Sequence, residues 1–504
     1  MNRKAEVAES GGGLNPELLL PLLLAIGVGA LAVSSQSFWM DESATAITAS
    51  QPNFSTWCRA MALNTGSDQQ MPLYMLFAWL WEKFWGYGEW ALRAANLPWL
   101  ALALAALPRR PAQLLPVVLL SPFLWFYLNE ARPYALQICA GLLLIGTLMR
   151  LADNSNEKTG YRWFATGIVL LAGSSLIGMI WAGAFLISAL IFLHPEKCRR
   201  LVVENRLTTA AATIFLSALA VYYWWTLMHV SNVTAGETGI GNLAFAGYEL
   251  LGFAGLGPGR AEIRTAGLAS FLPFWPQLMV AVAVTTVVLL AGLKAGFQSV
   301  PRRVWLGVAV AFGAATVFLF VAGELKHFRV LGRHFAPLAP LLLLLLAAGL
   351  NELRQRGRVG RAVVVIFISS SLASAFSLRF AERHAKDDYR SAAAVAHAAA
   401  AQHLRVWWCA DINAGLYYGL PVAPELAATT NQIWLALNAS ANALARQPVP
   451  DVVVLSRPEI NDPLGAVRDW LAQNHFYVAA SPHLFTVWRA VETNSQSRIK
   501  PIQP

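Results

Sequence analysis

Long apolar runs separated by short charged connections constrain this 504-residue chain more than any other feature. The runs recur between Leu18 and Leu378, and most have close to the roughly 20 residues that a helix needs to cross the hydrocarbon core of a bilayer. Only 13% of the residues are charged, whereas ordinary soluble domains carry about 25%. Apolar and polar residues do not alternate within the runs, as they would in the strands of a membrane barrel. The sequence therefore predicts a polytopic α-helical membrane protein.

Eleven spanning helices are predicted. Their ranges are 17–37, 89–107, 113–129, 132–151, 162–175, 177–193, 207–228, 276–293, 304–322, 335–350 and 362–378. The turn-forming residues Gly173-Ser174-Ser175 divide the long run 161–193 into two of them. The polar stretch 1–15 precedes an apolar run without a small-residue cleavage site, so we expect the first helix to be retained.

Lysine and arginine residues gather in five connections between the apolar runs. These clusters are Arg109 and Arg110; Arg150, Lys158 and Arg162; Lys197, Arg199, Arg200 and Arg206; Lys294, Arg302 and Arg303; and Arg354, Arg356, Arg358 and Arg361. With eleven helices all five lie on the side of the N-terminus, which the positive-inside rule makes cytoplasmic. The net charge of +10 then reflects membrane topology and not binding to nucleic acid. We expect a multi-pass protein of a bacterial cytoplasmic membrane, with its C-terminal segment on the periplasmic or extracellular side.

Two domains are expected, a transmembrane domain over 1–378 and an extracytoplasmic α/β domain over 379–504. In the second, an alanine-rich helix and the strand-like stretches "RVWWCA", "DVVVLS", "FYVAAS" and "LFTVWRA" follow one another. In the long outer loop 38–88 we expect one helix over 44–62 and another over 71–86, both lying at the membrane interface. The four cysteines match no metal-binding spacing. Pairing of Cys58 with Cys409 stays open, although free thiols are favoured.

An acidic pair, Asp41 and Glu42, follows the first apolar run on the outer side. Such a pair often only caps a helix. Basic residues also occur in outer loops, against the positive-inside bias, and the most notable precede the helix at 335–350. They are Lys326, Arg329 and Arg333, followed by His334. These bases snorkel or pair with Glu324, or else they bind an anion such as a phosphate, for which arginine is well suited.

Four stretches, taken in their order along the chain, resemble one superfamily of membrane enzymes. They are "WMDESATAITAS", "PLYMLFAWLWEKFWGYGEWALRAANLP", "NEARPYAL" and "GRHFAPLAPLL". Nearly the whole chain is similar to the glycosyltransferase-C (GT-C) superfamily of polyprenyl-phosphate-sugar-dependent transferases. The branch that it resembles contains protein O-mannosyltransferases and lipid A aminoarabinose transferases. One stretch departs from the family pattern, because Gln69-Gln70-Met71-Pro72 stands where the family often has His or Lys before Pro-Pro.

The resemblance implies a GT-C-like fold and an inverting glycosyltransferase that acts at the outer face of the membrane. It makes Asp41 the general base, with Glu42 orienting Asp41 or binding sugar or acceptor. The candidates for binding the donor phosphate are Arg333, Arg329, Lys326, His334, Arg132 and Arg93. Further site candidates are Glu130, Tyr74, Arg260 and Arg264. Two questions stay open. Arg132 either binds phosphate or forms an ion pair with Glu130 that braces the outer turn, and the stretch "GLGPGRAEIR" is either a mobile flap over the site or a plain loop.

The expected partners are a polyprenyl-phosphate-linked sugar donor, the lipid bilayer, and an acceptor that is a glycan, a lipid or a protein; no nucleic acid is expected. The chain has neither a P-loop nor a dinucleotide-binding glycine pattern, so no cofactor is required. A divalent cation held by Asp41 and Glu42 stays an open alternative. The competing functions are a transporter or flippase of a lipid-linked or small solute, and a glycan polymerase or ligase. Charges at the membrane edges and dissimilar halves disfavour the transporter.

Overall fold

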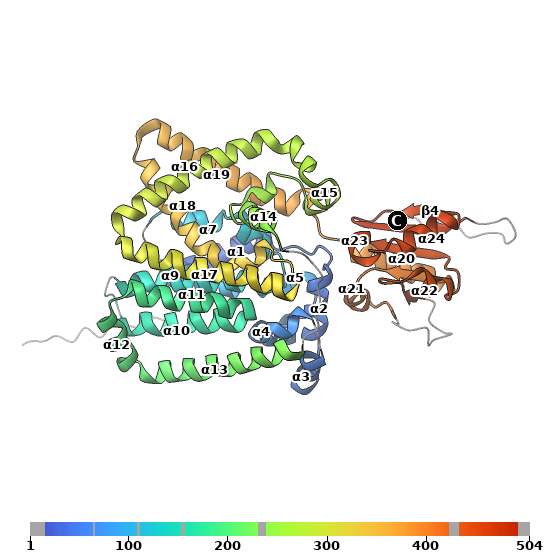
Figure 1. Ribbon diagram of the computed structural model, residues 1–504, viewed down its shortest axis with the longest axis horizontal. Coiled ribbons are helices and arrows are strands. Elements are labelled where there is room, and N and C mark those ends of the chain that lie inside the picture. The colour runs from blue at the N-terminus through green and yellow to red at the C-terminus, as the bar shows by residue number, and fades with distance from the viewer. Residues whose placement is uncertain are drawn as a thin grey trace, which may run out of the picture.

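The computed structural model describes residues 16–63, 66–107, 111–152, 157–229, 238–422 and 433–491. A large helical part ends with a helix at Phe380, and a smaller α/β domain lies at one end of it (Figure 1). This arrangement confirms the predicted fold class, an α-helical membrane protein with a C-terminal α/β domain.

Within the described residues, nine long helices make up most of the helical part. They are α1 (Pro16–Ala32), α9 (Tyr134–Ala152), α10 (Glu157–Ser174), α11 (Leu176–Phe192), α13 (Arg206–His229), α16 (Trp275–Ser299), α17 (Arg302–Lys326), α18 (Ala339–Arg354) and α19 (Gly357–Phe380). Among the described residues, six helical stretches are long and apolar enough to cross a membrane. A seventh span is added if α11 and the next helix, Pro195–Glu204, form a single broken span with a bend of 116° between them. The number of eleven spans stays a prediction.

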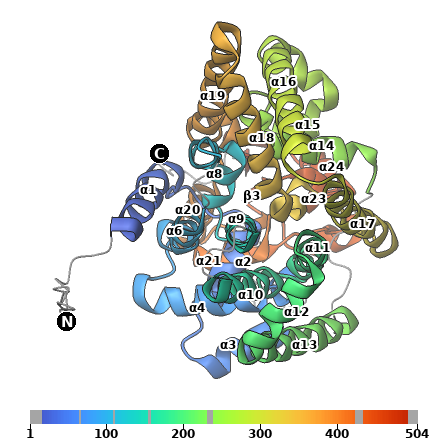
Figure 2. The ribbon, with the colours of Figure 1, turned by 90° about the vertical axis from the view of Figure 1, so that its left-hand side faces the viewer.

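The predicted break between the helices at 162–175 and 177–193 is confirmed. Helix α10 ends at Ser174, and the Ser175 side chain caps α11 by accepting a hydrogen bond from the Gly178 amide. Figure 2 shows α9 at the centre of the helical part, and its side chains are almost all buried. By contrast, α13 and α17 expose large apolar side chains such as Ile214, Val221 and Val310. An apolar outer surface of this kind suits contact with lipid.

Two predicted spans are interrupted. The segment 89–107 forms α5 (Glu89–Ala94) and α6 (Leu97–Ala106), and the segment 113–129 forms α7 (Leu114–Leu119) and α8 (Pro122–Leu128). Proline lies in the first turn of both α6 and α8, where its missing amide hydrogen costs nothing but the preceding helix cannot continue through it. The expectation of two unbroken helices is therefore wrong.

The segment 38–88, predicted to be the first outer loop, contains α2 (Met40–Ala49), α3 (Phe54–Leu63), the 3₁₀ helix η1 (Ser67–Gln70) and α4 (Pro72–Trp85). The helix predicted over 71–86 is confirmed as α4. The single helix predicted over 44–62 is wrong, because Pro52 separates α2 from α3. The Asn53 side chain then caps α3 by accepting a hydrogen bond from the Thr56 amide at 3.0 Å.

Shorter helices connect the remaining spans. They are α12 (Pro195–Glu204), α14 (Ile240–Leu250), η2 (Phe253–Gly255), α15 (Arg260–Ala266), η3 (Gly267–Phe274), η4 (Gly332–Leu338) and η5 (Glu382–His384). Helix α12, which carries the basic cluster 197–200, lies at the end of the bundle away from the α/β domain (Figure 1). Helices α2 and α15 lie at the opposite end of the helical part, next to the α/β domain. The predicted cluster of Arg109 and Arg110 lies outside the described residues.

The α/β domain is built on a five-stranded sheet. Its elements are α20 (Tyr389–Ala401), β1 (Val406–Cys409), α21 (Ile412–Tyr417), β2 (Ile433–Leu435), α22 (Ala441–Ala445), β3 (Val452–Ser456), α23 (Pro458–Asn461), α24 (Ala466–Gln473), β4 (Phe476–Ala480) and β5 (Phe485–Ala490). The strand order is β2-β1-β3-β5-β4, with β1 parallel to β2 and β3, and β5 antiparallel to β3 and β4. The predicted closing pair of strands is confirmed. All four cysteines are free thiols; Cys58 is exposed, whereas Cys409 is buried in β1.

Candidate active site

The acidic pair lies in the first turn of α2, where carboxylates interact favourably with the helix dipole. Glu42 is completely buried. Arg93 binds it through Nε to Oε1 at 2.9 Å and through Nη2 to Oε2 at 2.8 Å. The Lys386 ammonium donates to Oε2 at 2.8 Å, and the Ala131 amide donates to Oε1 at 2.8 Å.

The surroundings keep Glu42 ionised. Burial alone raises the pKa of this carboxyl, but the charges of Arg93 and Lys386 and their hydrogen bonds outweigh it and lower the pKa to about 2. Both carboxylate oxygens already accept strong hydrogen bonds. This geometry supports a structural role for Glu42 and leaves little capacity for binding a sugar or an acceptor.

Arg93, a candidate for phosphate binding, is also fully buried. Besides Glu42, its guanidinium donates to the carbonyl oxygens of Ser34 at 2.9 Å, Gln36 at 2.7 Å and Ser37 at 3.1 Å. Arg93 therefore fixes the chain that leads from α1 into α2. Its donors are used within the protein and do not face a ligand.

Asp41 has a different environment, because about a quarter of its side chain is exposed. Arg333 donates from Nη1 to its Oδ2 at 2.9 Å, although the two residues are 292 positions apart. Burial raises the pKa of Asp41, but the charges of Arg333, Arg132 and Arg457 outweigh it, so that the pKa lies below its ordinary value. Asp41 is therefore a carboxylate at neutral pH and remains partly accessible.

The basic residues predicted around Arg333 do not join it at the acidic pair. Lys326, at the end of α17, and Arg329 are exposed, and neither contacts Asp41 or Glu42 in the part of the chain that the structure describes. His334 is buried; its Nδ1 accepts a hydrogen bond from the Leu331 amide at 3.1 Å, and its carbonyl oxygen accepts one from Trp181 at 2.8 Å. Of the four, only Arg333 reaches the acids.

The expected ion pair between Arg132 and Glu130 does not form. Arg132 is buried and pairs instead with Asp68 of η1. It also donates to the Thr45 hydroxyl at 3.0 Å and to the Ser67 hydroxyl at 2.9 Å. Arg132 therefore ties the turn before α9 to the first outer loop, and sequence distance alone could not identify its partner.

Tyr74, another candidate, is 1% exposed. It packs in an apolar cluster with Trp57, Met61, Met71, Met75 and Leu136. Its side chain does not line the cavity described next, so the structure gives it a packing role.

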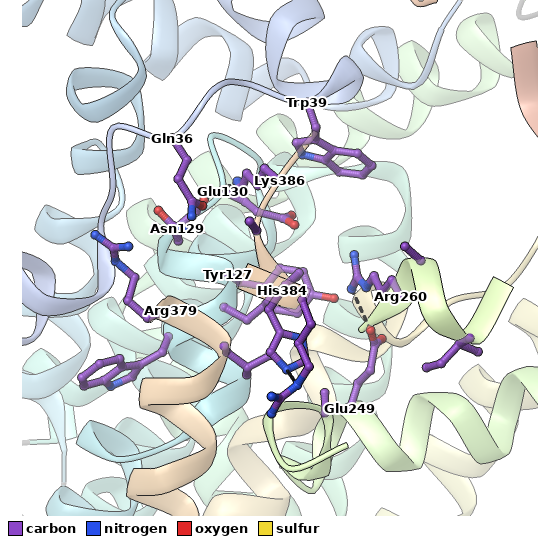
Figure 3. A pocket seen from close by; sticks show the side chains of 18 of the residues that line it. Gln36, Trp39, Tyr127, Asn129, Glu130, Glu249, Arg260, Arg379, His384 and Lys386 are labelled. Atoms are coloured by element: carbon purple, nitrogen blue, oxygen red, sulfur yellow. Dashed lines mark hydrogen bonds and ion pairs between the residues drawn. The ribbon is translucent and has the colours of Figure 1, made fainter. Parts of the chain in front are cut away.

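A cavity opens between α8, α14, α15, α19 and the segment that enters the α/β domain, and Figure 3 shows Trp39 and Lys386 in its wall. The acidic pair does not line it, but Trp39 lies two residues before Asp41, and Lys386 binds Glu42. It encloses about 1160 Å³, including its opening to solvent. Its cationic lining residues are Arg260, Arg264, Arg379, Arg383, Lys386 and Arg457, whereas its carboxyl groups are Glu130, Glu249 and Asp387. Much of the remaining wall is apolar and comes from Phe123, Trp125, Phe126, Phe245, Ala375 and Leu378. The cavity therefore combines an excess of positive charge with an apolar wall on the membrane helices.

Three predicted candidates line this cavity. Arg260 donates to Glu249 at 2.6 Å, and its guanidinium lies 4.4 Å from the centre of the Phe126 ring. Arg264 pairs loosely with Glu459 of the α/β domain at 3.5 Å. Glu130 also lines the wall, and the structure gives it no ion pair among the described residues.

Sequence reasoning missed two cations that come from the C-terminal side. Lys386 precedes α20 and reaches Glu42, and Arg457 pairs with the buried Asp387 at 2.6 Å. The Arg457 guanidinium lies 5.9 Å from the ring of Trp39, which also lines the cavity. The charged cluster Lys386-Asp387-Asp388, directly after the last apolar run, was the available signal.

Glu42 has little free capacity to join Asp41 in the divalent cation site that stayed open as an alternative. Both Glu42 oxygens are engaged by Arg93, Lys386 and Ala131, and a cation would have to displace them. Across the described residues, no group of three His, Cys, Asp or Glu side chains is arranged to hold a metal ion.

No protein-family model matches the chain, and no curated protein matches it significantly. Among solved structures, the crystal structure of ArnT from Cupriavidus metallidurans bound to undecaprenyl phosphate is similar to it. The two chains are 13% identical, with 95% of this chain and 99% of that chain covered and a TM-score of 0.47. A likeness of this size does not establish what this chain binds or which reaction it catalyses.

Proposed function

We propose that this protein is a membrane glycosyltransferase that moves a sugar from a polyprenyl-phosphate donor to an acceptor hydroxyl group, with inversion at the anomeric carbon. One observation carries the proposal: Asp41 is an ionised, partly accessible carboxylate, and Trp39, two residues before it, lines a cavity whose other lining residues are largely cationic or apolar. A phosphate attached to a long isoprenoid chain has the matching chemistry. The order of the four sequence motifs supports the same function.

Asp41 is suited to accept the proton of the acceptor. As the acceptor oxygen bonds to the anomeric carbon, the bond from that carbon to the phosphate oxygen breaks, and polyprenyl phosphate leaves with the electron pair. The acceptor proton moves to Asp41. Arg333 holds the carboxylate in place through the 2.9 Å contact and keeps it ionised. Attack opposite the leaving phosphate inverts the configuration, as in inverting glycosidases.

The cavity cations are suited to stabilise the leaving phosphate. Lys386, Arg457 and Arg260 come from different parts of the chain and line the same space. Preorganised positive charge aimed at the developing negative charge is commonly the largest contribution to such catalysis. The apolar wall from α8 and α19 offers a surface for the first isoprene units of the lipid.

The test is to replace Asp41 by Asn and measure release of undecaprenyl phosphate from undecaprenyl-phosphate sugars, with total membrane extract as the acceptor source. The loss of a general base lowers the rate by about 10²- to 10⁴-fold. Asp469→Asn, on the exposed surface of α24, is the matched control and should keep full activity. Unchanged turnover in a folded Asp41→Asn variant would falsify the assignment. Lipid-phosphate release in detergent, where no compartments exist, also separates a transferase from a transporter.

A further inference from the structure

Among the described residues that line the cavity, three have a buried polar atom with neither a hydrogen bond nor an ion pair. These atoms are the indole Nε1 of Trp39, the hydroxyl of Tyr127 and Oε2 of Glu130. Tyr127 is 1% exposed and Glu130 is 2% exposed. Buried polar atoms in folded proteins are nearly always hydrogen-bonded, so three such atoms in one cavity require an explanation.

These three groups have complementary hydrogen-bonding properties. The indole is only a donor, the phenol is both donor and acceptor, and a carboxylate is an acceptor. Figure 3 shows the three side chains around the same cavity, together with Lys386 and Arg260. Tyr127 and Glu130 are three positions apart at the end of α8, and the Glu130 amide donates to the Tyr127 carbonyl at 3.2 Å, which holds both on one wall.

The unpaired state of Glu130 is unusual in this setting. The cavity holds six cationic side chains, yet none forms an ion pair with this carboxylate in the described part of the chain. Lys386, the cation whose charge acts most strongly on Glu130, is already bound to Glu42 and to the Asn129 carbonyl. The backbone holds Glu130 in place, because its carbonyl accepts a hydrogen bond from Asn96 at 2.7 Å. The backbone at Glu130 is thus fixed, while its Oε2 has no partner among the described residues.

We infer that Trp39, Tyr127 and Glu130 form a subsite for the sugar ring of the donor, in which Glu130 accepts hydrogen bonds from ring hydroxyl groups. A polyol supplies several donors and acceptors on one small ring and satisfies all three groups, whereas a phosphate offers no match for a carboxylate. Trp39 is two residues before Asp41, so this subsite lies next to the proposed base. The inference rests on the proposed function and extends it to sugar recognition.

The test compares binding of two lipids to the full-length protein in detergent: undecaprenyl phosphate, and undecaprenyl phosphate bearing a hexose or a pentose. We expect Glu130→Gln to weaken binding of the preferred sugar-bearing lipid by about 10- to 100-fold, the usual effect of losing hydrogen bonds to a charged group. Binding of the bare lipid should stay unchanged, which also shows that the variant is folded. Tyr127→Phe should act in the same direction with a smaller effect.

Arg264→Gln is the matched contrast. Arg264 lines the same cavity, so its replacement should weaken the binding of both lipids equally. Equal effects of Glu130→Gln on both lipids, or an effect on the acceptor KM alone, would overturn the sugar subsite and leave the proposed function intact. If the wild-type protein binds neither lipid, the proposed function is rejected and the subsite with it.

Discussion

At the scale of single residues, Asp41 and Glu42 are neighbours in sequence but meet different partners. Glu42 is fully buried and accepts hydrogen bonds from Arg93, Lys386 and the Ala131 amide. Asp41 remains about a quarter exposed and binds Arg333. A buried carboxylate that is fully hydrogen-bonded organises its surroundings, whereas an accessible one can exchange protons with a ligand. The resemblance assigned function to both acids, and the geometry favours Asp41 alone.

Replacing Glu42 by Gln should destabilise the protein. The change leaves Arg93 and Lys386 as buried charges without their counter-ion, which typically costs about 3–5 kcal/mol. The measurement is the midpoint of thermal unfolding in detergent, with Glu352→Gln at the exposed end of α18 as a control. A Glu42→Gln protein as stable as the wild type, with reduced turnover, would instead indicate a direct catalytic role.

The stability of the protein at low pH should depend on the same interaction of Glu42 with Arg93 and Lys386. The pKa of Glu42 is lowered from 4.5 to about 2 in the folded state, so its contribution to stability is present above pH 4.5 and is lost as the pH falls toward 2. That contribution amounts to ~3 kcal/mol. The unfolding midpoint of the wild type should therefore fall over this pH range more steeply than that of Glu42→Gln. Parallel curves for the two proteins would contradict the assignment.

At the scale of elements, the first outer loop is a folded platform for the site. Pro52 ends α2 and separates it from α3, and this break allows the loop to return through η1 to the start of α9. There Asp68 meets Arg132, which also donates to the Asp41 carbonyl oxygen at 3.2 Å. The acidic pair is thus held by an element that sequence patterns describe poorly, a four-residue 3₁₀ helix.

Replacing Asp68 by Asn should release this brace. Arg132 is 1% exposed and loses its counter-ion, so we expect a destabilisation of about 3–5 kcal/mol. A double-mutant cycle with Arg132→Gln measures the coupling between the two side chains. Additive effects of the two substitutions would show that the pair does not act as a unit.

At the scale of the whole molecule, the α/β domain completes the cavity. It docks through Tyr418, whose hydroxyl accepts from the Phe38 amide at 2.8 Å, and through Arg390, which pairs with Glu89 at 2.5 Å. The segment leading into the domain contributes Lys386, and the domain itself contributes Arg457. Removing the domain should therefore impair the site directly and not only the recognition of the acceptor.

The pH dependence of activity should report the contribution of Lys386. Burial, followed by the charge of Arg93, lowers the pKa of Lys386 to about 8, although Glu42 and Glu130 oppose the shift. Above that pH Lys386 loses its charge, and the phosphate of the proposed donor would lose a nearby cation, so kcat/KM should fall. The Lys386→Arg variant stays charged, so the decrease of its kcat/KM on the alkaline side should begin at a higher pH. The Lys386→Met variant should have lower activity at all pH values. An alkaline limb that is the same in Lys386→Arg would exclude Lys386 as its source.

The sequence by itself determined the helical membrane class, the break at Ser175, the C-terminal α/β domain and the position of Asp41 shortly after the first apolar run. Apolar run length, turn residues and charge placement are local properties, so they can be read without coordinates. Only the tertiary structure decided the partners: Arg333 for Asp41, Lys386 for Glu42 and Asp68 for Arg132. It also placed Glu130 on the cavity wall, where its Oε2 has no partner among the residues that the structure describes. These contacts join residues 64 to 344 positions apart, and their strength depends on burial and on what else each side chain touches. No local pattern carries that information, because many charged residues could pair and the packing of the helices selects which of them do.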